Sequence, residues 1–556
     1  MSRRFSHFVA ASISLAALVA FTLAGAALPA QAQTYTVLYE NPGSTGIANP
    51  SAQAIAQGRD GNLYTTSTYG GTDYGTFFKF TPAGAVTVLN DTVGGFVASG
   101  VTLGTDGNFY GTNQDLGPTG GGCGFSGCGQ IYKMTPAGVE TVLYNFTNSA
   151  SDGYDPHSAP IEATNGKFYG TTPYSAGNYI SVAYSVTSTS GSFETVHVFA
   201  NSEGQDIFAG FVQGSDGNLY GVASDQGANG YGTVFKMTTA GVVTVLHNFD
   251  DSDGNYPYLP LIQASDGNFY GTTAYGGAYG AGVVFKITPS GTYTLLHSFE
   301  PSINEGNQPS SALLQATDGK LYGTTFYGGP YGNDGTIFNI TTGGTFTTLY
   351  NFCPVTGCAD GAGPNAPLKQ NTNGVLYGTT YNGGGTCNCG VVYSLNIGAK
   401  AFASLGSTSG KEGVKVNIFG QGFASTSVVK FGGTQATAVT RSGTTFLTAT
   451  VPAAALTGSV TVATGKTTLT SSQTFKVTPT QTTFDPPSGP VGTSVTITGT
   501  GLMQTSKVTF NKVSASFAVV SDTEVTATVP TGATTGKIAI TTKGGSASSA
   551  TSFTVN

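Results

Sequence analysis

The sequence predicts an all-β chain in which a seven-bladed β-propeller, closed by an N-terminal strand, is followed by two immunoglobulin-like (Ig-like) β-sandwiches. Glycine is abundant (82 of 556 residues), and only 9% of residues are charged. No stretch repeats its apolar residues with the 3.6-residue period of an amphipathic helix. A unit containing Asp-Gly-Asn, Tyr-Gly-Thr-Thr and Tyr-Gly-Gly recurs seven times, at intervals of 46 to 59 residues. A strand-only repeat with a period near 50 is typical of propeller blades.

Residues 1–32 have the three parts of a secretory signal peptide. Arg3 and Arg4 supply the charged start, residues 13–28 are apolar, and Ala30-Gln31-Ala32 fits a cleavage site. An uncleaved anchor is the alternative, but the apolar stretch is shorter than the roughly 20 residues that a spanning helix needs. We therefore expect a mature chain without a transmembrane segment. It would be secreted, extracellular or at the cell surface, with the periplasm as another destination.

Each unit contains four candidate strands, which we name A to D from the channel outwards. In the fifth unit they cover residues 259–264, 268–273, 283–288 and 292–299. The Asp-Gly turn between strands A and B is short, because these residues tolerate the positive φ of a type I′ turn. We interpret the repeated Asp and Asn as turn residues rather than as a row of functional carboxylates.

The seven units fill residues 33–398, but the seventh has no D strand of its own. The N-terminal residues 34–39 resemble the D strands of the other units. We therefore predict that they complete blade seven from the outside. This arrangement would join the two ends of the ring and remove exposed sheet edges.

The composition changes near Lys400, where Tyr disappears and Thr, Ser and Val become dominant. Residues 399–477 and 478–556 form two similar units with alternating β-branched positions separated by turn signals. This pattern predicts an Ig-like sandwich for each unit.

The repeat, from Asp-Gly-Asn through Tyr-Gly-Thr-Thr to Phe-Lys-Ile-Thr-Pro, resembles the GloVer tandem repeat of exported bacterial proteins. The resemblance implies a propeller and an exported protein, and it supplies no catalytic residues. Residues 487–501 fit the Pro-Ser-Gly-x-x-Gly-x-x-Val-x-Ile-x-Gly-x-Gly pattern and are similar to IPT/TIG domains. The unit at 399–477 departs from that pattern, with Ser407 in place of the proline. The resemblance implies that such domains act as spacers or contact modules.

Six cysteines form three close pairs, which an exported protein would use as disulfides. The pairs are Cys123/Cys128, Cys353/Cys358 and Cys387/Cys389. The first two would each close a short loop, worth about 2 kcal/mol in the chain-entropy treatment. A direct Cys387–Cys389 bridge is strained, so cross-pairing with Cys353 and Cys358 is an open alternative. A zinc site is not indicated, since no matching His or carboxylate pattern accompanies the cysteines.

The two faces of the predicted propeller differ in their loops. Strands alternate in direction, so the short A–B and C–D turns share one face and the variable B–C and D–A loops share the other. Variable loops on a rigid scaffold are where binding residues concentrate. We expect four tyrosines to serve as contacts there, because Tyr offers a flat apolar ring and a hydroxyl: Tyr69, Tyr275, Tyr327 and Tyr381. Packing onto the neighbouring blade is the alternative role.

Two further groups of residues bear on chemistry. The carboxylates of Asp250, Asp251 and Asp253 surround a glycine, which makes them a calcium candidate, although the downstream Glu of a full calcium loop is missing. A solvated acidic turn is the alternative. Among the histidines, only His157, beside Asp155, precedes an A strand and can approach the channel axis.

These observations predict no catalytic residue. The net charge is −7 and no Lys/Arg stripe is present, which argues against nucleic acid. We expect an exported, non-enzymatic binding or scaffold protein without a cofactor. It would be monomeric and present a propeller face to an extracellular glycan or protein. The alternative is a polysaccharide- or lactone-active lyase or hydrolase at the channel mouth. The Asp-Gly-Asn-Leu-Tyr turn supports that alternative because it resembles the Asp-Gly-Asn-Leu-Trp of virginiamycin B lyase.

Overall fold

The structure is a computed structural model. It describes residues 33–40, 47–50, 54–70, 75–91, 99–117, 123, 127–176, 179–354 and 357–556. The predicted signal peptide at 1–32 lies outside the described residues. Within them, strands are joined by loops and by three short 3₁₀ helices, η1 (Asn201–Glu203), η2 (Pro301–Ile303) and η3 (Gly385–Cys387). None of the described helices is long and apolar enough to cross a membrane.

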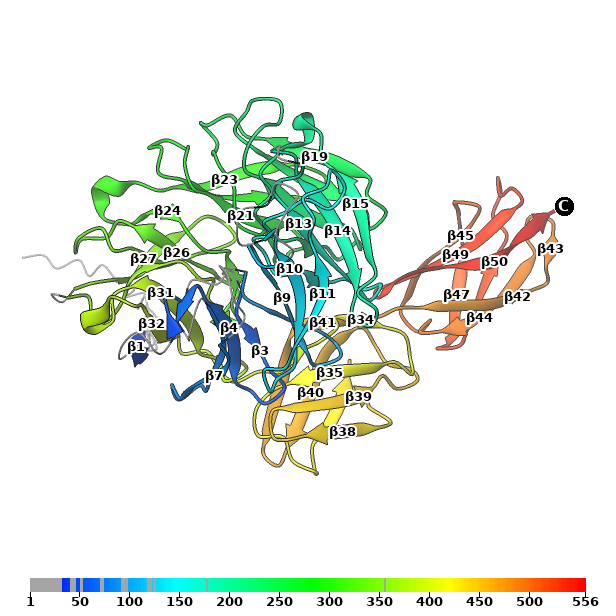
Figure 1. The fold of residues 1–556 in the computed structure, drawn as a ribbon. Helices are drawn as coiled ribbons and strands as arrows, with labels where there is room; N and C mark the ends of the chain where they lie inside the picture. The colour runs from blue at the N-terminus through cyan, green and yellow to red at the C-terminus, as the bar shows by residue number, and fades with distance from the viewer. Residues whose placement is uncertain are drawn as a thin grey trace, which may run out of the picture. The chain divides into compact units, whose positions relative to one another are not determined.

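Seven antiparallel sheets repeat the order A to D (Figure 1). Blades one to four contain β3 (Ala56–Gln57), β4 (Leu63–Ser67), β6 (Thr76–Phe80) and β7 (Val86–Asn90); β8 (Thr102–Leu103), β9 (Phe109–Asn113), β10 (Gln130–Met134) and β11 (Glu140–Asn145); β12 (Ile161–Glu162), β13 (Lys167–Thr172), β14 (Val182–Thr187) and β15 (Phe193–Val198); and β16 (Val212–Gln213), β17 (Leu219–Ala223), β18 (Thr233–Met237) and β19 (Val243–Asn248). Blades five to seven contain β20 (Ile262–Gln263), β21 (Phe269–Thr273), β22 (Val283–Ile287) and β23 (Tyr293–Ser298); β25 (Leu314–Gln315), β26 (Leu321–Tyr327), β27 (Thr336–Ile340) and β28 (Phe346–Asn351); and β30 (Lys369–Gln370), β31 (Leu376–Asn382), β32 (Val391–Asn396) and β1 (Thr34–Glu40). The seven-bladed propeller predicted from the repeat is confirmed.

Strand β1 closes the ring, as predicted. It pairs antiparallel with β32, with Thr34 opposite Asn396 and Val37 opposite Tyr393. The Tyr35 ring stacks on Tyr350 of blade six, with a centroid distance of 3.9 Å. The first strand of the propeller therefore serves as the D strand of its last blade.

The apolar core of the propeller is divided into seven clusters, each shared by two adjacent blades. Strands B and C are buried on both sides, so their apolar residues run almost without interruption, as in Phe269–Thr273. One cluster joins Phe80 of blade one to Val392 of blade seven. Burial of apolar area thus holds the blades together around the complete ring.

In five of the seven blades, a glutamine at the end of strand A links the blade to the one before it, a feature not predicted from the sequence. Gln315 Oε1 accepts a hydrogen bond from the Ser265 backbone N–H at 2.8 Å, and its Nε2 donates to the Gly319 carbonyl at 3.1 Å. The same inter-blade bond is made by Gln57, Gln213, Gln263 and Gln370. These bonds hold neighbouring A–B turns together.

The Asp-Gly turns have a second role beyond turn chemistry. Asp266 Oδ2 accepts hydrogen bonds from Tyr270 Oη at 2.7 Å and from Asn268 Nδ2 at 2.9 Å. Burial alone would raise the pKa of Asp266, but the hydrogen bonds from Tyr270 and Asn268 outweigh it and leave the pKa lowered. The turn carboxylate therefore satisfies the hydroxyl of a tyrosine whose ring is fully buried.

Two β-sandwiches follow the propeller, and they share one topology. The first contains β33 (Ser404–Leu405), β34 (Ser409–Gly410), β35 (Lys415–Phe419), β36 (Val428–Phe431), β37 (Thr434–Gln435), β38 (Val439–Ser442), β39 (Phe446–Thr450), β40 (Gly458–Thr464) and β41 (Thr467–Val477). The second contains β42 (Thr480–Asp485), β43 (Ser488–Gly489), β44 (Ser494–Thr500), β45 (Thr505–Phe510), β46 (Val513–Ala515), β47 (Phe517–Ser521), β48 (Glu524–Thr528), β49 (Gly536–Thr542) and β50 (Gly545–Val555). Each has its own apolar core, and the orders β33-β35-β39-β38 and β42-β44-β48-β47 correspond strand by strand.

Candidate functional site

The B–C and D–A loops are tied to each other in every blade whose loops the structure describes. Short antiparallel bridges join them, partly through β2 (Ile47–Ala48), β5 (Tyr69–Gly70), β24 (Asn307–Pro309) and β29 (Ala362–Pro364). The bridged pairs are Ala48/Tyr69, Tyr154/Tyr174, Gln205/Asp225, Asn255/Tyr275, Asn307/Tyr327 and Ala362/Asn382. The variable loops are therefore anchored to the scaffold and to one another.

The register of these bridges shows that the four predicted tyrosines do not all occupy equivalent positions. Tyr69, Tyr275 and Tyr327 occupy equivalent positions opposite a D–A loop residue. In blade seven that position is taken by Asn382, so Tyr381 lies one residue earlier and contacts the ring of Phe326 at 6.5 Å. Tyr381 thus faces a different neighbour, because blade seven has Tyr-Asn-Gly-Gly where blade five has Ala-Tyr-Gly-Gly.

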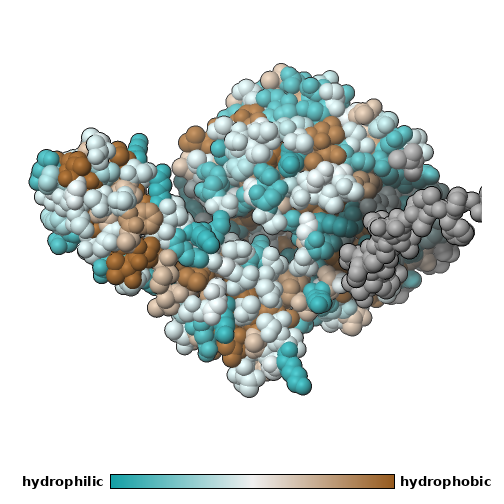
Figure 2. Space-filling view, turned by 180° about the vertical axis from the view of Figure 1, so that it is seen from behind, coloured by the Kyte–Doolittle hydropathy of each residue, from teal (hydrophilic) through white to brown (hydrophobic). Residues whose placement is uncertain are grey.

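Exposed aromatic side chains gather on this face. Among the described residues, all exposed aromatics are tyrosines in the B–C loops of blades three to six: Tyr179, Tyr231, Tyr275, Tyr279, Tyr327 and Tyr331. Tyr275 is 44% exposed and Tyr327 39%, whereas Tyr69 and Tyr381 are half-buried. The sequence analysis named only two of the six, although the spacing Tyr-Gly-Gly-x-Tyr-Gly would have revealed Tyr279 and Tyr331. We call these four B–C loops the tyrosine loops. In Figure 2, the hydrophobic residues on the face in view form small separate patches.

Charged residues divide between the two faces of the propeller. Its lysines and arginines all lie in or beside the A–B and C–D turns: Arg59, Lys79, Lys133, Lys167, Lys236, Lys286, Lys320 and Lys369. The formal charges in the described B–C and D–A loops are all acidic: Asp91, Asp115, Asp152, Asp155, Glu203, Asp206, Asp225, Asp250, Asp251, Asp253, Glu300, Glu305, Asp334 and Asp360. A face with this charge repels polyanions such as nucleic acids and acidic polysaccharides.

His157, in the D–A loop before strand A of blade three, lies in a polar group. Gln114 Nε2 donates a hydrogen bond to His157 Nδ1 at 2.8 Å. His157 Nε2 lies 3.2 Å from Asp155 Oδ2, but this buried nitrogen has no well-aligned hydrogen-bond partner. The imidazole packs edge-on against Phe208 at 4.9 Å. The structure thus brings a histidine, a carboxylate and an amide together.

Aromatic rings surround this group. The Tyr174 ring lies 5.4 Å from that of Tyr154, 5.6 Å from Tyr179 and 6.0 Å from Phe208. In all three pairs of rings the planes are tilted or edge-on rather than stacked. The rings therefore meet at angles instead of forming one stack.

Two more carboxylates, from blade four, approach the same place. Burial and the charge of Asp225 raise the pKa of Asp206, whose Oδ1 is buried without a hydrogen-bond partner. Burial, Asp206 and Asp155, in that order, raise the pKa of Tyr174. Burial, and then the charges of Asp206 and its neighbours, also raise the pKa of Tyr256. Backbone hydrogen bonds hold these segments together, since the Phe208 N–H donates to the Asp206 carbonyl at 3.0 Å and the Gln205 N–H donates to the Asp225 carbonyl at 2.8 Å.

The D–A loops repeat a left-handed residue directly after each bridge. Asp155, Asp206 and Tyr256 have φ values of 60°, 55° and 59°, and Asn49, Gln308 and Gly363 have positive φ at the equivalent positions. The left-handed region is uncommon for residues other than Gly, Asn and Asp, and a bulky tyrosine there is an outlier that the surroundings must hold in place. We define the mouth cluster as Tyr154, Asp155, His157, Tyr174, Asp206, Phe208, Asp225 and Tyr256.

The proposed calcium ligands bind partners within their own loop. Asp253 Oδ2 lies 2.8 Å from His247 Nε2, and Asp250 Oδ1 accepts hydrogen bonds from Ser252 Oγ and the Asp253 N–H at 2.7 and 3.1 Å. Asp251 Oδ1 accepts one from Asn255 Nδ2 at 3.0 Å. The three carboxylates therefore point to separate partners, and calcium binding here stays a prediction.

Two other histidines make the same kind of contact as His247. His197 Nε2 lies 2.9 Å from Glu203 Oε2, and His297 Nε2 lies 3.1 Å from Glu305 Oε1. The His297 ring also stacks on Phe346 of the next blade at 4.1 Å. These D-strand histidines join blades at the rim, far along the sheet from the mouth cluster.

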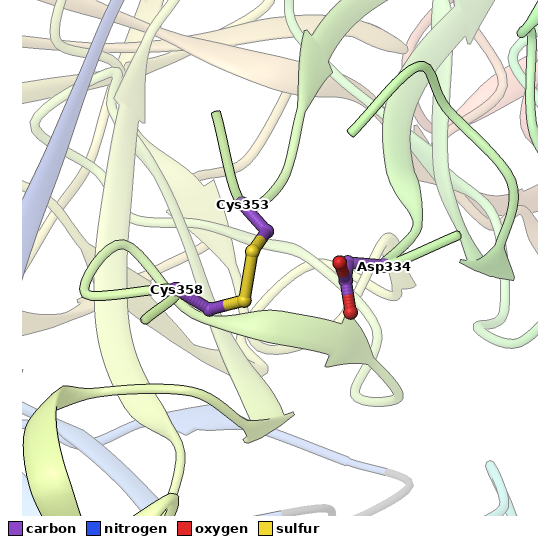
Figure 3. A group of neighbouring side chains, drawn as sticks. All are labelled: Asp334, Cys353 and Cys358. Atoms are coloured by element: carbon purple, nitrogen blue, oxygen red, sulfur yellow. A yellow bond between two sulfur atoms is a disulfide. The ribbon is translucent and has the colours of Figure 1, made fainter. Parts of the chain in front are cut away.

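All six cysteines form direct disulfides, Cys123–Cys128, Cys353–Cys358 and Cys387–Cys389. The cross-pairing left open by the sequence is not formed. Figure 3 shows the Asp334 side chain beside the Cys353–Cys358 bridge. Burial and the charge of Asp360 raise the pKa of Asp334. Because both sulfurs are bonded to each other, this group offers no thiolate ligands.

Solved structures resemble the chain at low identity. A streptogramin B lyase structure is 14% identical, covers 66% of this chain and 97% of its own, and has a TM-score of 0.46. A fungal alcohol oxidase of the AA5 family in complex with copper is 12% identical, with 94% and 100% coverage and a TM-score of 0.45. SGBP-B from a complex xyloglucan utilization locus in Bacteroides uniformis is 21% identical over 27% of this chain and 48% of its own, with a TM-score of 0.15. We infer nothing about function from similarities at this level.

The search of curated proteins found no match. Family patterns do match. The IPT/TIG domain pattern matches residues 479–555, which is the second sandwich. The Gloeobacter/Verrucomicrobia repeat pattern matches residues 25–213, 123–304 and 209–446, which together cover most of the chain. Both matches agree with the resemblances found in the sequence. The chain belongs to the Gloeobacter/Verrucomicrobia repeat family.

Proposed function

We propose that the protein is an exported binding protein that holds an extracellular glycan on the tyrosine loops. The observation that carries this proposal is that, among the residues that the structure describes, exposed aromatic side chains lie only in those four loops. A tyrosine ring stacks on the apolar face of a sugar, and its hydroxyl bonds to sugar hydroxyls at a low cost in side-chain entropy. The two sandwiches would serve as spacers or as a second contact.

The negative charge of this face limits the kind of glycan that it can bind. Its described loops carry carboxylates and no lysine or arginine. Acidic polysaccharides would be repelled, so the ligand is a neutral or basic glycan. The ligand would bind to loops that are already ordered. The bridges between the loops fix the tyrosines before a ligand arrives, which lowers the entropic cost of ordering them on binding.

The test measures binding of the mature chain to immobilised neutral and basic polysaccharides. We expect the double variants Tyr275→Ala/Tyr279→Ala and Tyr327→Ala/Tyr331→Ala to weaken binding about tenfold or more, as expected for lost aromatic contacts. The matched control is Val139→Ala/Val242→Ala, at exposed residues of the C–D turns on the other face. Absence of glycan binding by the unmodified protein, or equal losses in the control, would overturn the proposal.

A second candidate function is an enzymatic one at the channel mouth, a lyase or hydrolase acting on a polysaccharide or lactone. It is favoured by His157, whose Nε2 has no aligned partner while Asp155 lies 3.2 Å away. Because His157 Nδ1 accepts a hydrogen bond from Gln114, the ring carries its proton on Nε2, so His157 can donate a proton to a substrate and the Asp155 carboxylate can accept one. Incubation of the same polysaccharides with the protein and with His157→Ala tests this. Product formation that His157→Ala abolishes would support catalysis, and unchanged polysaccharide would rule against it.

Export and monomeric state are also part of the proposal. Three disulfides are typical of proteins that work in an oxidising compartment. Fractionation of the native cells, with mass spectrometry of the N-terminus, tests the location and the expected cleavage after Ala32. Light scattering of the purified chain tests the oligomeric state.

A further inference from the structure

We propose that the mouth cluster is a subsite for the protonated amino group of a glucosamine-type sugar. This inference rests on the proposed glycan binding and names the class of glycan. Two kinds of group lie together in the cluster: aromatic rings that meet at angles, and carboxylates with no lysine or arginine partner. An ammonium group is the ligand that satisfies both, since the ring faces and the carboxylates are each attractive to a cation.

The aromatic part of the subsite is formed by blades three to five. Tyr174 is half-buried and adjoins Tyr154 and Phe208, with centroid distances of 5.4 and 6.0 Å. Tyr256 adjoins Tyr258 at 5.8 Å and Tyr275 at 6.1 Å. None of these pairs is stacked face to face. Rings arranged at angles around one place can present several π faces to one cation, as in aromatic cages for ammonium groups.

The acidic part of the subsite is under-satisfied in the structure. Asp206 Oδ1 is buried and accepts no hydrogen bond. A buried acceptor without a partner costs on the order of 1–3 kcal/mol. Asp225 increases this cost by repulsion. A cation held at the mouth would reduce both effects, and the cluster itself contains no lysine or arginine to do so.

A bare metal ion fits less well than an organic cation. The described residues bring three metal-ligating groups within reach of one another at Asp334, Cys353 and Cys358, and not within the mouth cluster. A divalent ion there would find too few oxygen ligands, given that calcium takes six to eight. An ammonium group needs only one or two carboxylates and gains the rest of its stabilisation from the rings.

A sugar is favoured over a basic peptide as the carrier of the amino group. The cluster lies on the same face as the tyrosine loops, and Tyr174 contacts the exposed Tyr179 at 5.6 Å. A polysaccharide chain lying across several exposed tyrosines can place one amino-bearing ring at the mouth. The contacts available to it are flat rings and hydroxyls rather than a deep aliphatic pocket.

The experiment compares oligomers of β-1,4-linked glucosamine with N-acetylated oligomers of equal length, by calorimetry on the mature chain. Acetylation removes the charge and keeps the sugar. We expect the glucosamine oligomer to bind about tenfold more tightly or better, which corresponds to roughly 1.4 kcal/mol. The preference should shrink in high salt, because the attraction is electrostatic. It should also shrink as the pH falls through the raised pKa of Asp206, because protonation removes the carboxylate charge.

Three variants identify the subsite. Asp206→Asn and Tyr174→Leu should each lower glucosamine affinity about tenfold and change the affinity for the acetylated oligomer less than about twofold. Asp251→Asn is the control, since Asp251 is an exposed carboxylate on the same face outside the cluster. Circular dichroism of each variant shows whether it is folded. For a variant that fails to fold, the comparison of the two oligomers with the unmodified protein still decides.

Three results would overturn the inference: equal affinity for both oligomers, no effect of Asp206→Asn, or tighter binding of oligolysine than of oligoglucosamine. The proposed function fails in a different way. If acetylated and free oligomers bind equally and the loss follows Tyr275→Ala/Tyr279→Ala, glycan binding stands and the ammonium subsite falls. If no polysaccharide binds at all, both fall.

Discussion

On one face of the propeller, the carboxylates of the Asp-Gly turns bind the buried tyrosines of their own repeats, and glutamines join five of the turns to their neighbours. On the other face, the described loops carry carboxylates without lysine or arginine, and exposed tyrosines. Both faces are made from the same repeat. The difference shows that constancy along the repeat marks residues that hold the ring together, whereas irregularity marks the surface available to a ligand.

Two tyrosines of blade five test this contrast most strongly. The Tyr270 ring is fully buried and its hydroxyl is bound to Asp266, whereas Tyr275 is 44% exposed. Tyr270→Ala should lower the free energy of unfolding by about 3–5 kcal/mol, the usual cost of removing a buried ring. Tyr275→Ala should change it by less than about 0.5 kcal/mol. Urea unfolding of the two variants measures the difference, and similar losses would contradict the assignment of roles.

The inter-blade glutamines give the next largest effect. Gln315→Leu leaves the Ser265 N–H without its acceptor and should lower the free energy of unfolding by about 1–2 kcal/mol. Gln435→Leu, at an exposed position of the first sandwich, is the control and should change it by less than about 0.5 kcal/mol. Thermal unfolding followed by tyrosine fluorescence checks both. A neutral Gln315→Leu would mean that the bond is replaced by water.

The two faces should respond to pH with opposite sign. The pKa of Asp266 is lowered, so its contribution to stability is present at neutral pH and lost as the pH falls through its folded-state pKa. The pKa of Asp206 is raised, so folding becomes more favourable at this residue as the pH falls. At neutral pH, Asp266→Asn should therefore cost about 1 kcal/mol, and Asp206→Asn should cost nothing or stabilise.

Unfolding of the unmodified protein and both variants at neutral and acidic pH measures these signs. Asn165 and Asn373 already replace the turn aspartate in blades three and seven. Because asparagine already occurs at this turn position, we expect Asp266→Asn to lower the stability only modestly. Two variants with the same pH dependence would remove the electrostatic distinction between the faces.

The smallest expected effect on stability is that of His297, on the outer strand of its blade. Burial lowers the pKa of His297 below its ordinary 6.5, and Glu305 opposes this only in part. The neutral imidazole is favoured in the folded state, so stability is lost as the pH falls below 6.5 towards the folded-state value. His297→Tyr, which copies Tyr350 of blade six, should flatten this loss and leave stability at about pH 8 unchanged. Unfolding curves across that range check it, and an unaltered slope would contradict it.

Much of the scaffold could be predicted from sequence because it depends on local rules that recur seven times. Asp-Gly turns, buried aromatic strands and the missing D strand of the seventh unit sufficed for the blade number and for closure by residues 34–39. The glutamines could also be recognised in the sequence, since Gln precedes the A–B turn in five copies, as in Gln-Ala-Ser-Asp-Gly-Asn around Gln263. Their meaning was missed because their bonding partners lie in the neighbouring repeat.

The candidate site was predicted less completely. His157 beside Asp155 and two exposed tyrosines, Tyr275 and Tyr327, were found because each stands out within its own repeat. Asp206 and Tyr174 were missed, because they come from different blades and loops of different length. Their meeting depends on how neighbouring repeats pack, which no local pattern in one repeat encodes.

Closure by β1 has a consequence for the order of events during synthesis. Thr34 leaves the ribosome long before Asn396, its partner in the finished sheet. Blades one to six can form from neighbouring sequence as they emerge, but blade seven must wait for both ends of the ring. The last step of folding therefore joins the residues that are farthest apart in the sequence. We expect this step to limit the folding rate, because long-range pairing is slow in general. Until then, Thr34–Glu40 is an unpaired, strand-forming segment, and it is the part of the nascent chain most exposed to pairing with the wrong partner.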